Sequence, residues 1–377
     1  MNAVTGVAAA AGREALTISA DLADERVCAV RVASTRATHL SRLFIGRPAH
    51  EAPLLAERIF SLCGASHRVV AARAIARARG EPICARRHRG ETVALIAERL
   101  GASLRSNMIL AFQDRAGARD LDLVRPVADL LSLCRELCSQ ALARSTQASV
   151  DGKTASSLIG RICALGRDLG LRLARDGSMR PSGFAFEPLE REFGASESFT
   201  VAAPDSLSDA EDAEVMERLR AEGASFAAAP WLAGRAPETG AFARRWARTD
   251  FSRGALAARF QARMIDIAEC FTELQRAETD APDPCALSPA PREGFAAEET
   301  SRGRLCHWVR LSADDRIEEH QTVAPTEWNF HPTGPFIEAL LGATIRCDCA
   351  ERRILQLAGL FDPCVPFRVN VREHGHA

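Results

Sequence analysis

Two short stretches near opposite ends of the chain place the strongest constraint on its fold. The first, Arg58–His67, offers the thiol of Cys63 followed four residues later by the imidazole of His67. The second, Phe361–Phe367, places Cys364 directly after Asp-Pro, and a proline there stops a regular helix and holds the thiol on a bend. Thiolates are ligands for soft metal ions. We predict that the fold brings these thiols together around one soft metal, with Cys63 and Cys364 as its ligands.

Composition excludes several functional classes. The chain has 377 residues, of which 47% are hydrophobic, enough for one large core or two ordinary ones. Its formal net charge of −1 creates no general field that attracts nucleic acid or an anionic membrane. No apolar run is long enough to span a bilayer, and residues 1–12 have the character of a loose arm rather than a signal peptide. We expect a cytoplasmic protein that binds neither nucleic acid nor membrane.

The twelve cysteines do not form a recognisable framework. A chain of this size does not need disulfide staples, and no Cys-x-x-Cys occurs that would indicate a zinc ribbon or a redox pair. Histidines 307, 320 and 331 also lack metal-ligand spacing. We expect His307 to be a core histidine or one that supports a neighbouring site.

Apolar periodicity predicts a mainly α fold with a small β element (α+β), as one domain over residues 1–377. At Gly64, a helix N-terminus would leave amides and a thiolate facing a site. Helical patterns cover residues 51–79 in two pieces joined at Gly64, 121–145, 155–175, 253–277, 335–341 and 351–359. Strand patterns cover one or two strands within 16–45 and a hairpin formed by 303–311 and 316–323.

Residues 178–238 differ from the rest. They contain five prolines, a serine-rich patch and an acidic segment. We predict a loop-rich insertion with one short polar helix near 208–222, which would serve as a flap or docking surface.

Five stretches, in order, resemble the large subunit of nickel–iron hydrogenases. Arg58–His67 is similar to that family's Arg-x-Cys-Gly-x-Cys-x-x-x-His motif, and Asp362–Asn370 to its Asp-Pro-Cys-x-x-Cys-x-x-His motif. Between them, Glu238–Arg244 resembles Val-Gly-Pro-Leu-Ala-Arg, Glu299–His307 resembles Glu-Ala-Pro-Arg-Gly-x-Leu-x-His, and Ala324–Asn329 resembles Val-Pro-Thr-Thr-Trp-Asn. The resemblance implies a nickel–iron hydrogenase large-subunit-like fold.

The departures from that family concern nickel. Four thiolates bind the metals in the family, two terminal on nickel and two bridging nickel to iron. Phe60 and Phe367 stand at two of these positions here, and Asn370 replaces the last histidine. Phenylalanine has no lone pair to give, so the sulfur-rich nickel site cannot be built from this chain alone. We therefore expect no nickel and no enzyme activity.

The residues around iron are retained. By resemblance, Arg302 and Thr326 fall where the family donates hydrogen bonds to the two cyanides on iron, and a guanidinium and a hydroxyl suit an anionic nitrogen. Leu305 and Pro325 fall where the family lines the pocket for the cyanides and carbon monoxide. His67 falls near the bridging sulfur of the first motif, where it can support that thiolate.

This pattern resembles the HupK/HoxV group of hydrogenase accessory proteins. The resemblance implies a scaffold that transiently holds iron as an Fe(CN)2(CO) unit, or a precursor, before the large subunit receives it. Its partners would be hydrogenase maturation proteins, including a small iron-carrying chaperone, and the hydrogenase large subunit. Cys364 occupies a nickel-terminal position, so reaching iron requires the tail to shift, which Phe367 would permit.

Two alternatives remain open. An active hydrogenase with altered ligands would bind nickel and oxidise hydrogen. A metal-free interaction protein would bind maturation factors through residues 178–238. Each site residue also has a plainer interpretation: Cys63 as a structural thiol, Arg302 as a core ion-pair partner and Thr326 as a cap at a strand end. Selective survival of the residues on the iron side favours the scaffold.

Overall fold

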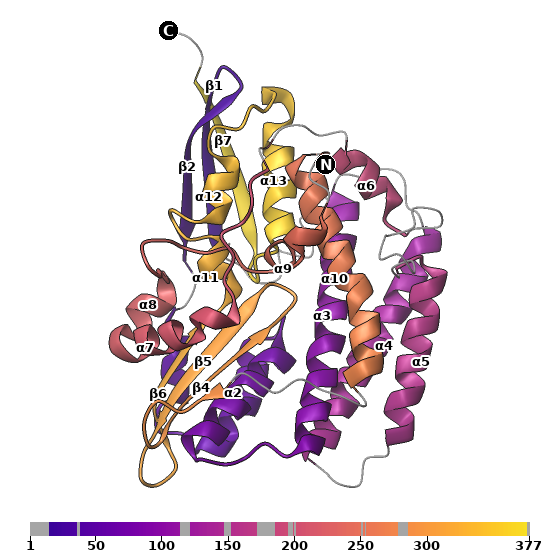
Figure 1. Ribbon diagram of the computed structural model, residues 1–377. Helices are drawn as coiled ribbons and strands as arrows, with labels where there is room; N and C mark the ends of the chain where they lie inside the picture. Colours follow the sequence, from indigo (N-terminus) through magenta and orange to yellow (C-terminus); the bar gives the residue numbers. More distant parts are fainter. Residues whose placement is uncertain are drawn as a thin grey trace.

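Helices make up most of the protein, and two small sheets lie beside them (Figure 1). The computed structural model describes residues 15–35, 38–113, 121–146, 152–171, 185–194, 199, 201–249, 252, 254–277 and 286–374. The α-helices are α1 (Ala52–Ile59), α2 (Gly64–Ala78), α3 (Ala85–Gln113), α4 (Leu121–Thr146), α5 (Gly152–Asp168), α6 (Glu187–Gly194), α7 (Asp212–Glu222), α8 (Ala224–Ala228), α9 (Ala241–Arg245), α10 (Ala255–Ala277), α11 (Pro325–Asn329), α12 (Pro335–Leu340) and α13 (Ala350–Phe361). The predicted α+β class is confirmed.

The first sheet joins the two ends of the chain. Its strands are β1 (Leu16–Ala23), β2 (Arg26–Ser34) and β7 (Phe367–His374), in the order β2-β1-β7. Every second residue of β1 is buried, as expected for a strand with one face on the core. β7 runs parallel to β1, with Phe367 opposite Leu16. The tail that follows Cys364 is therefore fixed against the first strand.

The second sheet carries α2, the helix that follows Cys63. It contains β3 (Ala286–Leu287), β4 (Glu293–Glu299), β5 (Arg304–Leu311) and β6 (Ile317–Val323), all antiparallel. The backbone of α2 approaches β4 so closely that a Cβ at Gly294 would overlap the carbonyl oxygen of Ala74 and lie 2.5 Å from the nitrogen of Ala78. Close packing of α2 on this sheet sets the position of the first thiol stretch.

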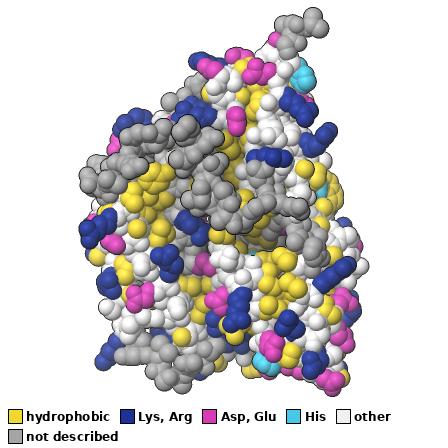
Figure 2. Space-filling model, turned by 180° about the vertical axis from the view of Figure 1, so that it is seen from behind, with side chains coloured by type: hydrophobic (Ala, Val, Ile, Leu, Met, Phe, Trp, Pro, Cys, Tyr) yellow, Lys and Arg dark blue, Asp and Glu magenta, His cyan; other side chains and the backbone are white. Residues whose placement is uncertain are grey.

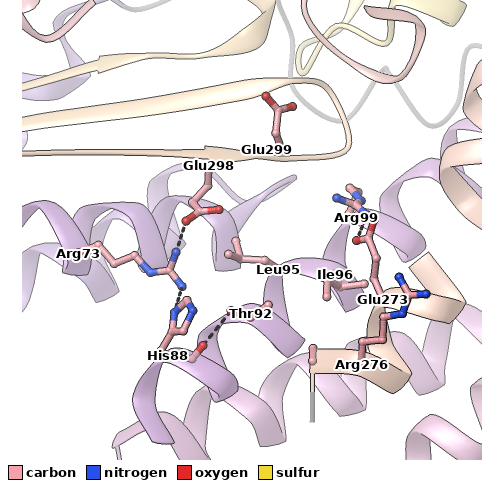
Figure 3. A pocket seen from close by; sticks show the side chains of 11 residues that line it. Arg73, His88, Thr92, Leu95, Ile96, Arg99, Glu273, Arg276, Glu298 and Glu299 are labelled. Atoms are coloured by element: carbon pink, nitrogen blue, oxygen red, sulfur yellow. Dashed lines mark hydrogen bonds and ion pairs between the residues drawn. The ribbon is translucent and has the colours of Figure 1, made fainter. Parts of the chain in front are cut away.

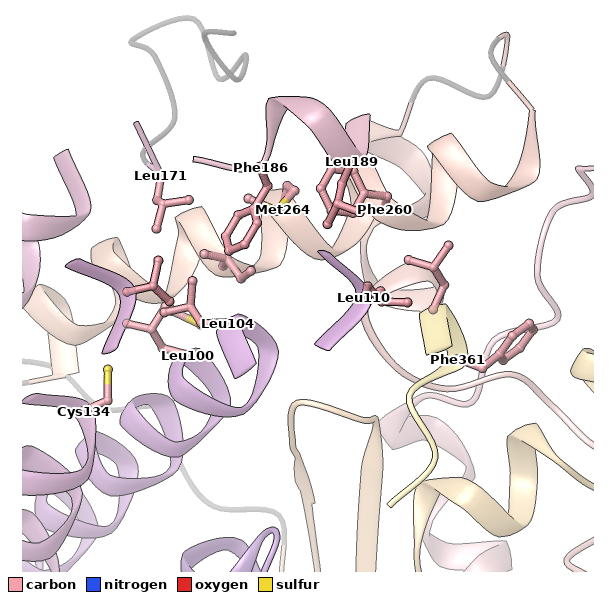
Figure 4. Close-up of a cluster of buried hydrophobic side chains, with 14 of the residues drawn as sticks. Leu100, Leu104, Leu110, Cys134, Leu171, Phe186, Leu189, Phe260, Met264 and Phe361 are labelled. Atoms are coloured by element: carbon pink, nitrogen blue, oxygen red, sulfur yellow. The ribbon is translucent and has the colours of Figure 1, made fainter. Parts of the chain in front are cut away.

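The largest apolar cluster lies among α3, α4, α5 and α10 and extends to α13 (Figures 1 and 4). Leu100 and Leu104 of α3 lie in it together with Phe260 and Met264 of α10. The predicted amphipathic pattern of residues 253–277 places its apolar side here, because Phe260, Met264, Ile267, Phe271 and Leu274 are all buried. Phe361, the last residue of α13, connects this core to the turn that carries Cys364.

Most predicted elements are confirmed within a few residues. Residues 51–79 form α1 and α2, and α2 begins at Gly64 as expected. The hairpin is β5 and β6. The predicted helices near 121–145, 253–277, 335–341 and 351–359 are α4, α10, α12 and α13. The helix predicted near 155–175 is α5, but it ends at Asp168, and residues 172–175 lie outside the described residues. The predicted N-terminal arm lies outside the described residues.

The prediction of a single helix in residues 178–238 was wrong. α7 confirms the expected helix, but α6 and α8 also lie in this segment. α6 exists because Leu189 and Phe193 form a buried apolar side that packs on α10. Strands β4 and β7 were also missed.

We expect Gly294→Ala to lower the free energy of unfolding by about 2 to 3 kcal/mol, because the backbone of α2 leaves no room for a Cβ. Gly160→Ala is the matched control. Gly160 is an exposed residue of α5 with nothing within 4 Å of its Cβ position, so alanine should stabilise the helix by about 0.5 to 1 kcal/mol. Urea unfolding measures both changes. Equal effects from the two substitutions would contradict this packing.

Candidate functional site

The two thiols predicted as metal ligands line one cavity of about 850 Å³. Cys63 comes from the residue before α2, and Cys364 from the turn between α13 and β7. Phe60 and His67 line the same cavity. Both cysteines are partly buried, and neither is in a disulfide. The fold thus brings together the two stretches that lie near opposite ends of the sequence.

The backbone around Cys63 is fixed by the start of α2. A Cβ at Gly64 would lie 2.7 Å from the carbonyl oxygen of Glu57 in α1, so only glycine fits at this first position of α2. The amides of Ala65 and Ser66 do not face the cavity as open donors, contrary to expectation. They donate instead to the carboxylate of Glu98 at 2.8 and 2.9 Å. A carboxylate at a helix N-terminus satisfies both the free amides and the dipole.

The turn that carries Cys364 is held from both sides. Arg263 of α10 donates to the carbonyl oxygens of Gly359 and Leu360 at 2.9 and 2.8 Å, which satisfies the end of α13. Thr326 then binds Cys364 twice. Its hydroxyl lies 3.1 Å from Cys364 Sγ and accepts the Cys364 N–H at 3.1 Å. The residue predicted to face a cyanide therefore contacts the second thiol directly.

Arg302 lies in the turn between β4 and β5 and is only 5% exposed. Its Nε is 3.5 Å from Asp362 Oδ2, but Nε and Nη1 form no hydrogen bond with any described residue. Burial alone would lower the pKa of Arg302, yet the negative fields of Asp362, Cys63, Cys364 and Glu98 outweigh it and raise that pKa. The two thiols thus lie around a permanently charged guanidinium with unused donors.

Sequence reasoning missed several polar neighbours of this guanidinium. Ser106 donates to Asp362 Oδ1 at 2.8 Å. Burial and the adjacent charge of Arg302 lower the pKa of Arg105, while burial raises the pKa of Glu98. Glu98 and Arg105 are seven residues apart on α3, so helical periodicity places them on one face, and that spacing was the available signal.

The three middle stretches that resemble hydrogenase motifs meet behind Arg302. The side chain of Asn329 accepts the N–H of Thr239 at 3.0 Å and donates to its carbonyl oxygen at 2.9 Å. The hydroxyl of Thr239 accepts the N–H of Arg304 at 2.8 Å. Gly240 and Gly303 have φ of +114° and +133°, and each packs against the other segment. These contacts fix the turn from which Arg302 extends.

Three imidazoles run from the cavity into the core. His67 Nδ1 lies 2.9 Å from His307 Nε2, and His307 Nδ1 lies 3.1 Å from His320 Nε2. Phe60 stacks on His67 with ring centroids 3.8 Å apart, and Phe44 stacks on His320 at 4.0 Å. Burial lowers the pKa of His307 well below its ordinary value and that of His320 to about 3. His307 therefore supports His67, one of the two roles expected from the sequence.

Leu305 and Pro325 are buried, but neither is among the described residues that line the cavity. Leu305 packs in the apolar cluster beneath α2, and Pro325 is the first residue of α11. Phe367 pairs with β1. Among the residues that the structure describes, no three His, Cys, Asp or Glu side chains form a ready ligand set. The two thiols of the cavity therefore have no third such side chain grouped with them in the described part of the chain.

A second cavity, of about 250 Å³, lies between α3, α10 and β4 (Figure 3). Its charged groups pair with one another: Arg73 contacts Glu298 and His88, and Arg99 contacts Glu273. Burial raises the pKa of Glu298, while Arg73 opposes that rise. These pairs support the end of β4, close to the turn that carries Arg302.

The surface shows mixed charge. On the face seen in Figure 2, basic and acidic side chains are interspersed with apolar ones. Within the described ranges, every helix is either too short or too polar to cross a bilayer.

Comparisons with known proteins agree on one family. The family model for nickel-dependent hydrogenase matches residues 220–369. The chain is 35% identical to the hydrogenase expression/formation protein HupK of Rhizobium leguminosarum bv. viciae, over 96% of this chain and 98% of that protein. It is 29% identical to the hydrogenase expression/formation protein HoxV of Cupriavidus necator, over 91% and 93%.

Among solved structures, the [NiFeSe]-hydrogenase of Dm. baculatum matches with a TM-score of 0.62 at 15% identity, over 90% of this chain and 94% of that chain. The predicted hydrogenase large-subunit-like fold is confirmed.

We expect Thr326→Val to loosen the turn that carries Cys364, because valine cannot accept the Cys364 N–H or donate to its sulfur. An amide left unpaired in a partly buried site costs about 1 to 2 kcal/mol. Urea unfolding should show that loss, and peptide-resolved alkylation should show faster labelling of Cys364. Thr326→Ser keeps the hydroxyl and should behave like the parent protein. A valine variant unchanged in both measurements would refute this role.

The buried histidines predict acid sensitivity. Burial lowers the pKa of His320 to about 3 in the folded chain, whereas a histidine in the unfolded chain has a pKa of about 6.5. Below about pH 6.5, His320 therefore binds a proton in the unfolded chain but not in the folded chain. Stability is then complete above that pH and falls, as pH decreases, by about 1.4 kcal/mol per unit for this group. His320→Phe should reduce the slope of unfolding free energy between about pH 6 and pH 4 by that amount. Identical slopes in variant and parent would disprove it.

Proposed function

Because the chain belongs to the family of HupK and HoxV hydrogenase expression/formation proteins, we propose that it is a scaffold that transiently holds an Fe(CN)2(CO) unit, or a precursor of it, before a hydrogenase large subunit receives it. The names of these relatives support a role in hydrogenase assembly. Iron is the cargo of such a protein rather than a resident cofactor. The partners would be maturation proteins, including a small iron-carrying chaperone, together with the large subunit.

One observation carries the proposal. Two thiols from opposite ends of the chain line the same cavity, and both raise the pKa of the buried Arg302, which has unused donors but is not among the described lining residues. A buried N–H without an acceptor is costly, so a site of this kind favours an anionic ligand that accepts from Arg302. Cyanide bound to iron is an anionic acceptor, and thiolates are soft ligands for the metal itself. The donor set therefore fits the proposed cargo.

Transfer would proceed by ligand exchange. Cys63 and Cys364 lose their thiol protons when they bind the metal, since the thiolate is the ligand. The cavity of about 850 Å³ leaves room for an incoming group beside them. A thiolate of a partner can then replace one of the two protein sulfurs, and the cargo leaves with the partner.

The tail can shift only locally. Cys364 lies between the end of α13 and the start of β7, and β7 pairs with β1 along eight residues. A movement of Cys364 is therefore confined to residues 362–366. A movement of the sulfur toward a bound metal would break its two contacts with Thr326.

The replaced thiolate positions support a site without nickel. Phe60 occupies its place by stacking on His67, and Phe367 occupies its place as a paired strand residue. A phenylalanine side chain has no lone pair in any rotamer, so neither position can bind a metal through its side chain.

A metal-free interaction protein is the alternative function. It would bind maturation factors through residues 178–238, where α6, α7 and α8 lie. The buried ion pair between Asp212 of α7 and Arg304 of β5, with Arg304 Nε 2.5 Å from Asp212 Oδ1, ties this segment to the second sheet. That tie favours a fixed surface over a moving flap.

We expect protein purified anaerobically with its maturation partners to show cyanide and carbonyl stretches in the infrared, with iron present and nickel absent. Cys63→Ala and Cys364→Ala should each lose the bands and the iron, because one thiolate alone holds the metal weakly. Cys84→Ala is the control, since Cys84 is an exposed thiol directly before α3 and is not among the residues that line the cavity.

The same samples separate the alternatives. Absent bands, combined with normal hydrogenase maturation in cells that carry Cys63→Ala or Cys364→Ala, would overturn the scaffold in favour of the metal-free function. Bound nickel with hydrogen oxidation by a dye would point to an active hydrogenase instead.

A further inference from the structure

The hydrogen bonds along the row of imidazoles behind the cavity all run in one direction. His67, His307 and His320 are 2%, 0% and 1% exposed, so solvent does not compete for their ring nitrogens. Contacts of 2.9 and 3.1 Å link Nδ1 of His67 to Nε2 of His307, and Nδ1 of His307 to Nε2 of His320. A neutral imidazole carries one N–H and one acceptor nitrogen. The tautomer of one ring therefore fixes the tautomers of the other two.

The inner end of the row decides between the two possible directions. Nδ1 of His320 is buried and has no hydrogen-bond partner among the described residues, and the ring stacks on Phe44. If Nδ1 of His320 carried the proton, a buried N–H would lack an acceptor. If Nε2 carries it, only a lone pair is left unused. Unpaired buried donors are the rarer and more costly of the two.

The favoured direction then propagates outward. His320 Nε2–H donates to His307 Nδ1, so His307 carries its own proton on Nε2 and donates to His67 Nδ1. His67 is left with its proton on Nε2. The hydroxyl of Thr322, 3.5 Å from His307 Nδ1, can donate to the same nitrogen and is compatible with this direction.

We infer that His307 and His320 are positioning residues that hold His67 in the tautomer with the proton on Nε2, so that its ring presents a hydrogen-bond donor to an anionic, sulfur-bound group in the cavity. The identity of that group rests on the proposed function, whereas the direction of the row does not. Residues behind a metal-binding shell commonly set the tautomer and orientation of a histidine in this way. Phe60 adds to the effect because it stacks on His67 and restrains the ring.

The test is ¹⁵N NMR of the imidazole rings in the full-length chain without cargo, labelled at histidine. The His67 signals are assigned by their loss in His67→Gln. We expect a protonated Nε2 and an unprotonated Nδ1 for His67, and the same for His307. A His67 ring with its proton on Nδ1 would overturn the inference.

Two substitutions at His320 test the cause. His320→Gln keeps an N–H donor for His307 Nδ1 and should leave the His67 tautomer unchanged. His320→Phe keeps a ring against Phe44 but removes the donor, so a second His67 signal with the proton on Nδ1 should appear. A His67 tautomer that is unchanged in His320→Phe would show that the row does not set it.

This outcome is separable from the outcome of the proposed function. The NMR measurement uses the chain without iron, so absent infrared bands would leave a correct tautomer assignment standing. Conversely, infrared bands in the parent protein together with the opposite His67 tautomer would retain the scaffold and refute only the role of the histidine row.

Discussion

The arrangement of the site depends on burying one guanidinium. Moving a charged group out of water is costly unless negative groups and hydrogen-bond acceptors surround it. Arg302 gains the fields of Asp362 and Cys364, which lie in the turn before β7, and of Cys63, which lies directly before α2. The turn that holds it is fixed by Thr239 and Asn329 rather than by its own hairpin alone. The protein therefore balances the charge of Arg302 with negative groups, but it leaves two of the donor atoms of this residue without an acceptor among the described residues.

The pairing of the two ends of the chain places the two thiols where they act on the charge of Arg302. β7 lies parallel to β1, so the turn before β7 is fixed at both ends, and Arg263 holds the preceding helix end. On the other side, α2 is fixed by its close packing on β4 and by Glu98 at its N-terminus. Each cysteine thus belongs to a short turn between rigid elements. Such a construction keeps both thiols in place at one cavity.

Sequence reasoning identified the residues with strong local signals. The stripe of α10 and the β5–β6 hairpin follow from periodicity and turn chemistry, and the motif resemblance led to Cys63 and Cys364. It missed β7 because a parallel strand that pairs with the far end of the chain leaves no local signal. It missed the histidine row for a related reason. His320 lies opposite Val309 and His307 opposite Thr322, so their contact depends on strand register, which spacing in the sequence does not reveal.

The number of thiolates gives the proposed transfer its direction. The nickel–iron hydrogenase large subunits that this chain resembles use four thiolates for their two metals, whereas this cavity supplies Cys63 and Cys364. A soft metal moves from a site with fewer sulfur ligands to one with more when the other ligands travel with it. Phe60 and Phe367 remove the two sulfurs that would have made the chain a competitor of the acceptor. In the proposed transfer, the unused donors of Arg302 would hold the anionic ligands of the cargo without adding a bond to the metal, and release would be left to ligand exchange.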